Sequence, residues 1–359
     1  MTLADIANLR LLNQQIESSK FKSAKDLVSF MGAMQAQDYA MAKWAVGLRL
    51  QNSTEKKIEK AVDNGEIIRT HLMRPTWHFV SADDIHWMLE LTAPQMKAAA
   101  KSRHKQLSLT EKIFAKSNNI IEKSLRDGNH LTREELMKII AKEKIPTSAE
   151  FSIHLMFRAE TDGIVCSGKI KNNKQTYALL AERAPKKKSV TKDEALALLA
   201  KKYFSSHAPA TLKDFIWWSG LLVKHATHAL EMIKKDFISE KIGDKTYWLN
   251  GPFDENTIKK SSVNLLPAFD EFLISYRDRT ASLHIDHHKK SISNNGIFWP
   301  VIVTNGQVTG TWKRTIKNEK AIIETEFFNP KSKTNIKLIQ NAAERFGKFL
   351  EKETEVIIK

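Results

Sequence analysis

Apolar residues recur at three- and four-residue steps in the first part of the chain, which predicts a series of amphipathic helices. The first predicted helix has Ile6, Leu9, Leu12 and Ile16 on its apolar face, and the second begins with Leu27, Phe30 and Met31. The stretch from Met31 to Arg49 continues this spacing and predicts one further helix. A more polar helix over residues 57–64 ends at Gly65.

A β-hairpin is predicted after these helices. The stretch EIIRTHLMRPTWHFV (66–80) has apolar residues near both ends, and Arg74-Pro75 marks the turn between two short strands. Helices followed by a strand–turn–strand unit have the element order of a winged helix-turn-helix. The first part of the chain is therefore predicted to be a winged helix.

The same order returns twice along the chain. Residues 131–161 predict two helices, and GIVCSGKIKNNKQTYALL (163–180) predicts a hairpin that turns near Lys171–Asn173. Pro185–Lys188 resembles a linker, after which helices and an alternating stretch over 238–249 form a third round. A weak internal repeat of this kind predicts three tandem winged-helix modules. Their expected ranges are 1–100, 101–184 (which includes a basic bridging helix) and 185–257.

From Ser262 onward the pattern changes to alternating apolar and polar residues, which predicts β-strands. Asn305-Gly306 has the sequence of a type I′ hairpin turn. A final amphipathic helix from Lys333 to Lys352 is expected to cover this sheet, and the tail EVIIK could add an edge strand. The predicted fold class is α+β: three tandem winged-helix modules followed by a C-terminal β-rich domain (258–359).

Composition and charge narrow the possible partners. The chain has 359 residues, 42% of them hydrophobic, a formal net charge of +16 and a pI near 9.6. This charge favours a polyanionic partner, nucleic acid before acidic membrane, although a lysine-rich proteome would produce the same excess. Eight Lys and Arg residues fall within 97–126, which is either a solvated helical face or a phosphate contact.

The cysteine and hydropathy patterns indicate the compartment. Cys166 is the one cysteine, so an internal disulfide and a cysteine-based metal site are excluded, and a strand position suits it better than a nucleophilic role. The N-terminus lacks the apolar stretch of a signal peptide, and no apolar run approaches the ~18 residues of a membrane span. We expect a cytoplasmic, nucleoid-associated protein that does not associate with a membrane. We also expect a monomer, since no repeating apolar seam indicates a dimer.

Gln35-Ala36-Gln37, followed by Asp38, is the first candidate for chemistry. Residues two apart on a regular helix point in different directions, so a working pair would need a helix end or a turn. An amide cannot act as a general base, but it can hold a water with its carbonyl and donate through its NH₂ group. Spacing alone leaves open whether this is a surface pair, a cap or a site.

The first hairpin and one C-terminal hairpin supply candidate nucleic-acid contacts. In the first hairpin, a stacking role for the tryptophan and a core role are equally compatible with strand alternation, and the histidines could instead satisfy local backbone groups. The second hairpin contributes a basic pair after Gly310-Thr311-Trp312. The candidate DNA-binding residues are Arg69, His71, Arg74, Trp77, His78, Lys313 and Arg314.

Six stretches together resemble one family. They are RLLNQQI, MQAQDYAMAKWAVGLR, RTHLMRPTWHFVSADD, HAPATLKDFIWWSGL, LLPAFDEFLISYRDR and GIFWPVIVTNGQVTGTWKR, in this order along the chain. Their sequence and order are similar to the winged-helix DNA glycosylases of the AlkZ/YcaQ type, from about residue 6 to residue 350. That family has three tandem winged helices and a C-terminal β-rich domain, removes alkylated bases and unhooks interstrand crosslinks.

The resemblance implies catalytic roles for the two glutamines. The family divides into Gln-x-Gln and Gln-x-Asp members, and this chain has the first form, so Gln35 and Gln37 are implied to hold the water that attacks C1′. Two amides suffice only when the leaving base is already cationic, as N7- or N3-alkylated purines are, because positioning then lowers the barrier. Asp38 is either a helix cap or a support for the sugar cation.

The resemblance also bears on cofactors and alternatives. His284–His288 looks like a metal cluster, but the family has an ordinary loop there, and we expect neither a metal nor a cofactor. The leading hypothesis is a monofunctional DNA glycosylase acting on double-stranded DNA with alkylated or crosslinked bases, with no candidate lysine for lyase chemistry. A non-catalytic winged-helix DNA-binding protein or regulator is the second hypothesis, and an RNA-binding role is the third.

Overall fold

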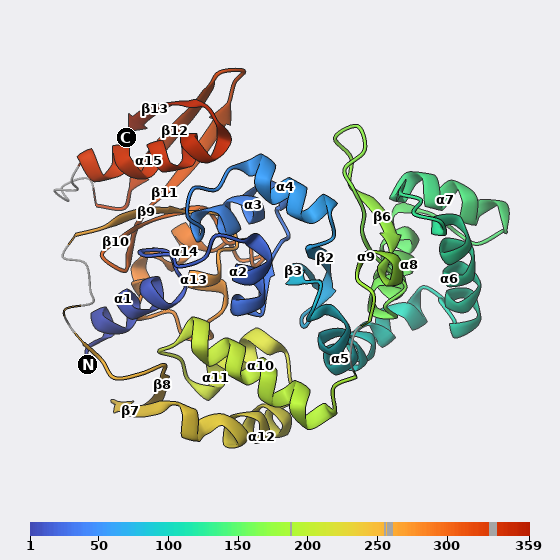
Figure 1. Ribbon diagram of the computed structural model, residues 1–359, viewed down its shortest axis with the longest axis horizontal. Helices are drawn as coiled ribbons and strands as arrows, with labels where there is room; N and C mark the ends of the chain where they lie inside the picture. Colours follow the sequence, from blue (N-terminus) through green and yellow to red (C-terminus); the bar gives the residue numbers. More distant parts are fainter. Residues whose placement is uncertain (187–188, 255, 257–260, 330–335) are drawn as a thin grey trace.

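The computed structural model describes residues 1–186, 189–254, 256, 261–329 and 336–359. Figure 1 shows a mixed α+β molecule in which the N-terminal helices lie between the C-terminal sheet and a group of helices from the middle of the chain. The predicted α+β class is confirmed. The 257/258 boundary and Lys187-Lys188 of the predicted linker fall outside the described residues.

The first module has three short strands among its helices. Its elements are α1 (Leu3–Asn13), α2 (Ala24–Met31), β1 (Ala33–Gln35), α3 (Tyr39–Leu48), α4 (Glu55–Asp63), β2 (Ile67–Leu72) and β3 (Thr76–Ser81). The strands are ordered β1-β3-β2. The single helix predicted from Met31 to Arg49 is wrong, because Gly32 (φ 80°) ends α2 and a strand intervenes before α3. The predicted β2–β3 hairpin is confirmed.

The second module stands apart from the others at the end of a long helix, α5 (Ile85–Gln106) (Figure 1). It contains α6 (Glu111–Leu125), β4 (Leu131–Thr132), α7 (Arg133–Lys142), α8 (Ala149–Thr161), β5 (Val165–Ser167), β6 (Thr176–Leu179) and α9 (Leu180–Arg183). Its three strands are ordered β4-β6-β5, and most of its apolar core is its own. Cys166 is buried on β5, as predicted.

The basic bridge of residues 97–126 consists of the end of α5, a turn and α6 rather than of one helix. The predicted boundary at 100/101 lies inside α5. Several of its cations are paired with acids of the second module: Lys97 with Asp162, Arg103 with Glu150, and Lys116 with Glu143. Such pairs agree with a solvated helical face, one of the two interpretations of the charge.

The third module contains α10 (Lys192–His207), α11 (Leu212–Ser219), α12 (Val223–Ile233), the short 3₁₀ helix η1 (Lys234–Asp236), β7 (Ile238–Ile242) and β8 (Lys245–Leu249). Ala210, between its first two helices, exchanges two backbone hydrogen bonds with Trp248 of β8. The first two modules have a short strand at the equivalent position. It is β1, between α2 and α3, in the first module and β4, between α6 and α7, in the second, and each pairs with the last strand of its module, β3 or β6. The predicted repeat in element order is therefore also a repeat in strand pairing.

The C-terminal part forms a five-stranded sheet in the order β13-β12-β11-β10-β9. Its elements are β9 (Val263–Leu266), α13 (Glu271–Ile274), η3 (Ile285–His287), α14 (His288–Ser291), β10 (Val301–Thr304), β11 (Gln307–Ile316), β12 (Lys320–Phe327), α15 (Ile336–Leu350) and β13 (Glu353–Ile358). Asn305 and Gly306 have φ of 48° and 79°, which confirms the type I′ turn. The final helix and the edge strand are also confirmed, while residues 333–335 of the predicted helix lie outside the described residues.

The apolar cores do not follow the order of the chain. Trp44 of α3 packs against Phe346 and Phe349 of α15, each with ring centroids 5.1 Å away, so the first module and the C-terminal sheet share one core. The other face of the first module shares a second core with the third module. Residues distant in sequence therefore meet around β1 and α3.

A buried ion pair fixes this junction. Arg49, at the end of α3, donates to both carboxylate oxygens of Asp270 at 2.7 and 2.9 Å, and both side chains are buried. Arg49 also donates to Gln14, and Asp270 accepts the backbone N–H of Phe272 as the N-cap of α13. The pair therefore sets where α13 begins relative to α3.

Removing one partner of this pair tests its contribution to stability. Asp270→Ala leaves the Arg49 guanidinium buried without its counter-charge, so we expect the free energy of unfolding to fall by about 3–5 kcal/mol. Urea titration followed by circular dichroism measures this loss. Glu324→Ala removes the surface partner of Lys359 and should leave the midpoint almost unchanged. A similar small shift for both variants would contradict the assignment.

Candidate active site

The Gln35-Ala36-Gln37 segment runs from the last residue of β1 into the turn before α3, and none of it is helical. Gln35 is opposite His78 in the β1–β3 pairing, and the N–H of Ala36 donates to the carbonyl of Trp77 at 2.7 Å. Asp38 then caps α3 by accepting the N–H of Met41 at 3.0 Å. The cap interpretation of Asp38 is confirmed, and the strand-to-helix turn is the kind of position at which two glutamines two residues apart can work together.

The two glutamines differ in environment. Gln35 is 6% exposed, whereas Gln37 is exposed on the surface. Within the part of the chain that the structure describes, no hydrogen bond reaches the Gln37 side chain. Gln35, in contrast, is held at its backbone and at its side chain by two residues that come from different modules.

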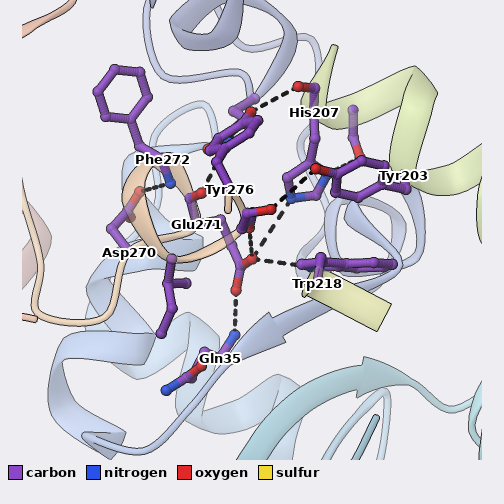
Figure 2. A network of polar contacts seen from close by, with 12 residues as sticks. Gln35, Tyr203, His207, Trp218, Asp270, Glu271, Phe272 and Tyr276 are labelled. Carbon is purple, nitrogen blue, oxygen red and sulfur yellow. Dashed lines mark hydrogen bonds and ion pairs between the residues drawn. The ribbon is translucent and has the colours of Figure 1, made fainter. Parts of the chain in front are cut away.

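Glu271, the first residue of α13, holds the backbone of Gln35. Its Oε1 accepts the N–H of Gln35 at 2.6 Å, although the two residues are 236 positions apart in sequence. Its Oε2 accepts from the Trp218 indole at 3.3 Å and from Ser275, and lies 3.7 Å from the His207 ring (Figure 2). Four groups thus surround one buried carboxylate.

These contacts keep Glu271 ionised despite its burial. Burial raises the pKa of the carboxyl, but His207, the Ser275 hydroxyl and the Gln35 N–H outweigh it, so the pKa is about 2. Burial lowers the pKa of His207, and the neighbouring Glu271 opposes this shift. A depressed pKa contributes stability that is complete above the ordinary glutamate pKa and is lost progressively as the pH falls from there towards about 2.

Arg74 orients the side chain of Gln35. Its Nη2 donates to the Gln35 Oε1 at 3.1 Å. Because a guanidinium can only donate, the amide oxygen must face Arg74 and the NH₂ group must point elsewhere. Arg74 was predicted as a DNA contact; the structure places its guanidinium on the catalytic candidate and 5.9 Å from the Trp217 ring centre.

Arg69 and Trp77 lie together beside the motif. The Arg69 guanidinium stacks 4.6 Å from the Trp77 ring centre, and its Nε donates to the carbonyl of Ala36 at 2.9 Å. Both side chains are half-buried. Trp77 is thus neither a full core residue nor a freely exposed stacking platform, and the DNA-binding role of the two residues stays a prediction.

The two histidines of the hairpin do not present charges to solvent. His78 is fully buried, and burial together with the nearby Arg74 lowers its pKa to about 3. His71 is also buried, and its Nδ1 and backbone N–H both contact Glu160 of the second module at 2.7 Å. The prediction that these histidines bind phosphates therefore conflicts with their positions, because the two rings lie on opposite faces of the hairpin and each face is covered at that point, with Glu160 of the second module against His71.

Lys313 and Arg314 of β11 lie beside Asp38 in one pocket of about 840 Å³. Arg314 reaches the sulfur of Met41 on α3, and Lys313 is exposed. The structure thus brings three predicted residues from opposite ends of the chain to one cavity next to Gln37. Among the described residues, no group of three or more His, Cys, Asp or Glu side chains is arranged to hold a metal ion.

Sequence reasoning did not single out Glu271, His207 or Trp218. The Asp270-Glu271 pair before a short apolar run resembles a helix N-terminus, and nothing local connects it to residue 35. Trp218 is buried in the core that the third module shares with the first, a position that gives no local sign of a contact with Glu271. Only a signal linking LLPAFDEF to MQAQD as spatial neighbours would have revealed the contact.

Comparisons with known proteins identify the family. The family model described as "DNA glycosylase AlkZ-like" matches residues 28–349. The chain belongs to the AlkZ-like DNA glycosylase family. The family resemblance predicted from the sequence is confirmed, and so is the prediction that the protein is a DNA glycosylase.

Two relatives of this AlkZ-like chain come from Streptomyces sahachiroi. One, named "Interstrand DNA cross-link repair glycosylase", is 26% identical over 329 residues and covers 85% of each chain. The other is the solved structure named "Streptomyces sahachiroi DNA glycosylase AlkZ", with a TM-score of 0.80, 20% identity and coverage of 99% of this chain and 100% of that one. The second comparison confirms the fold over the whole length.

Glu271→Gln tests the role of the buried carboxylate in the AlkZ-like site. The new amide would place an NH₂ group against N–H and O–H donors, so the Gln35 backbone should shift and base release should slow by about 10- to 100-fold. We expect the Kd for damaged DNA to stay within about twofold, which separates positioning from a loss of folding or binding.

Asp278→Asn is a matched control for Glu271→Gln. Asp278 also has a pKa of about 2, but it pairs with Lys245 and Thr280 rather than with Gln35. Single-turnover base release by this control should match the wild type. Wild-type rates for Glu271→Gln in a folded protein would show that Glu271 does not position the motif.

Proposed function

We propose that this protein hydrolyses the N-glycosidic bond of cationic N7- or N3-alkylated purines in double-stranded DNA, as a monofunctional glycosylase, with Gln35 and Gln37 positioning the water. The observation that carries the proposal is the oriented amide of Gln35 beside the exposed Gln37 in the β1–α3 turn. The name of the Streptomyces relative extends the proposal to the unhooking of interstrand crosslinks.

The two amides have different roles in this proposal. Arg74 occupies the Gln35 oxygen, so the Gln35 NH₂ donates to the oxygen of the water. The carbonyl of Gln37 accepts a hydrogen of the same water, which leaves the second lone pair of the water to attack C1′. As the C–N bond breaks, its electron pair passes to the cationic base, and the proton of the attacking water passes to solvent.

This arrangement predicts substrate class. Glycoside hydrolysis generally uses carboxylates to protonate the leaving group and to activate water. Gln35 and Gln37 can do neither, so the leaving base must already be cationic.

Cys166 is buried and its pKa is raised by burial to about 12, which makes a thiolate nucleophile unsuitable.

The net charge of +16 supports binding to the DNA backbone. Lys313 and Arg314 are the candidates nearest the motif, since they share a pocket with Asp38. We propose that the protein acts as a monomer on chromosomal DNA. No helix in the described part of the chain is long and apolar enough to cross a membrane.

Substitution of each glutamine tests the proposed chemistry. Gln35→Ala and Gln37→Ala should each reduce release of 7-methylguanine from methylated duplex DNA by about 100-fold or more, because the water loses one of its two contacts. The Kd for the same duplex should change less than about threefold, since neither side chain carries charge.

Gln307→Ala is the matched control, because this glutamine lies on β11 and bonds to the carbonyl of Ala281 away from the motif. Its release rate should equal that of the wild type. If Gln35→Ala and Gln37→Ala both released the base at the wild-type rate, the two glutamines would not be the catalytic residues. DNA binding without base release from methylated or crosslinked duplex would favour the alternative of a non-catalytic DNA-binding protein.

The pH dependence of base release tests whether amides or carboxylates act on the water. Glutamine does not titrate, and Glu271, with a pKa of about 2, stays ionised. We therefore expect the single-turnover rate, corrected for spontaneous depurination, to be flat from about pH 3.5 to 6.5. A carboxylate base of ordinary pKa, about 4, would instead lose activity as the pH falls below about 4.5, and that result would contradict the proposal.

A further inference from the structure

The pocket next to the motif has the composition of an aromatic-binding site. It lies between β11, β12, the segment 297–300 and the start of α3, and its volume is about 840 Å³. This value is near the upper end of the range for pockets that hold drug-sized ligands (~300–1,000 Å³). We call it the aromatic pocket; its main walls are Phe269, Trp299, Trp312 and Phe328, with Met41 and Asp38 at the α3 side.

Its walls leave apolar ring surface open to solvent. Trp299 is 45% exposed, and Phe269 and Phe328 are half-buried. Trp312 is a buried wall residue, and its indole N–H already donates to the carbonyl of Leu266 at 2.8 Å. Lys290 and His287 already lie against the Phe328 ring, so Trp299 is the wall residue with the most exposed ring surface, and it suits the stacking of a planar group.

Phe269 provides an independent sign of function. Its φ of 57° places a bulky residue in the left-handed region, which costs about 1–3 kcal/mol and is concentrated at binding and active sites. Its backbone N–H donates to the carbonyl of Phe298 at 3.3 Å, which helps to hold this conformation. The strained residue directly precedes Asp270 and Glu271, so the wall of the aromatic pocket and the support of Gln35 belong to one segment.

Charges at the aromatic pocket suit a cationic base on a phosphate backbone. Lys290 and Lys313 are exposed at its edge, and Arg314 is half-buried. Asp38 and Glu326 add two carboxylates to the same lining, which reduce the repulsion that the cations would exert on a positively charged base. Asp38 is the chain neighbour of Gln37, so this lining continues directly into the motif.

We infer that the aromatic pocket receives the alkylated purine together with a planar aromatic substituent, and that Trp299 stacks on that substituent. This inference rests on the proposed function and adds the substrate class: N7 adducts that carry an aromatic ring are preferred over small methyl adducts. A single methylated purine leaves much of the volume unused and makes less contact with Trp299, which is the reason for the preference.

Two duplexes that differ only in the N7 substituent test this inference. One carries 7-benzylguanine and the other 7-methylguanine, so both leaving bases are cationic and only the first has the additional ring. The wild type should bind and excise the benzyl adduct at least about tenfold better, because stacking contributes roughly 1–3 kcal/mol per ring. Trp299→Ala should reduce this preference to less than about threefold.

The control is Ile153→Ala, which removes a comparably exposed apolar side chain on α8, outside the lining of the aromatic pocket. It should preserve the preference for the benzyl adduct. Both Kd and single-turnover release are measured, so the two proposals fail differently. Absence of release from either duplex would contradict the glycosylase chemistry, whereas a Kd preference that is absent or unaffected by Trp299→Ala would overturn the inference.

Discussion

Two adjacent carboxylates, Asp270 and Glu271, connect the C-terminal sheet to the first module, and the candidate site depends on them. Each is buried, and a buried charge is tolerated only when it is paired and hydrogen-bonded. Asp270 receives the guanidinium of Arg49, and Glu271 receives the backbone N–H of Gln35. A shift of α13 would leave both charges unpaired, so the geometry of the motif is tied to the stability of the whole molecule.

The site that results is built for positioning rather than for proton transfer. A strand end and a helix cap hold the turn, Arg74 sets the direction of the Gln35 amide, and burial lowers the pKa of the neighbouring His78 so that its ring stays neutral near pH 7. Such a site accelerates only a reaction whose leaving group needs no protonation. This physical limit is the reason for proposing cationic lesions as the substrates.

The modules also have uneven roles. The second module keeps most of its core to itself. It contacts the first through buried polar groups, such as Glu160 with His71 and Ser167 with the backbone of Arg69, and through a few apolar residues, among them Cys166 and Leu180. The first module instead shares its two cores with the third module and the C-terminal sheet. The β2–β3 hairpin, which was predicted to contact DNA, therefore also forms part of the interface between the first and second modules.

Local patterns were enough to predict the class of fold, the repeated order of helices and hairpins and the turn at Asn305-Gly306, because periodicity and turn chemistry depend on near neighbours. They could not separate α2, β1 and α3, since a short strand buried on both sides has the same apolar letters as a helix. Nor could they show that His78 faces inward or that Glu271 holds Gln35. Those facts depend on which distant segments share a core, and only the tertiary structure decides which buried polar groups find partners.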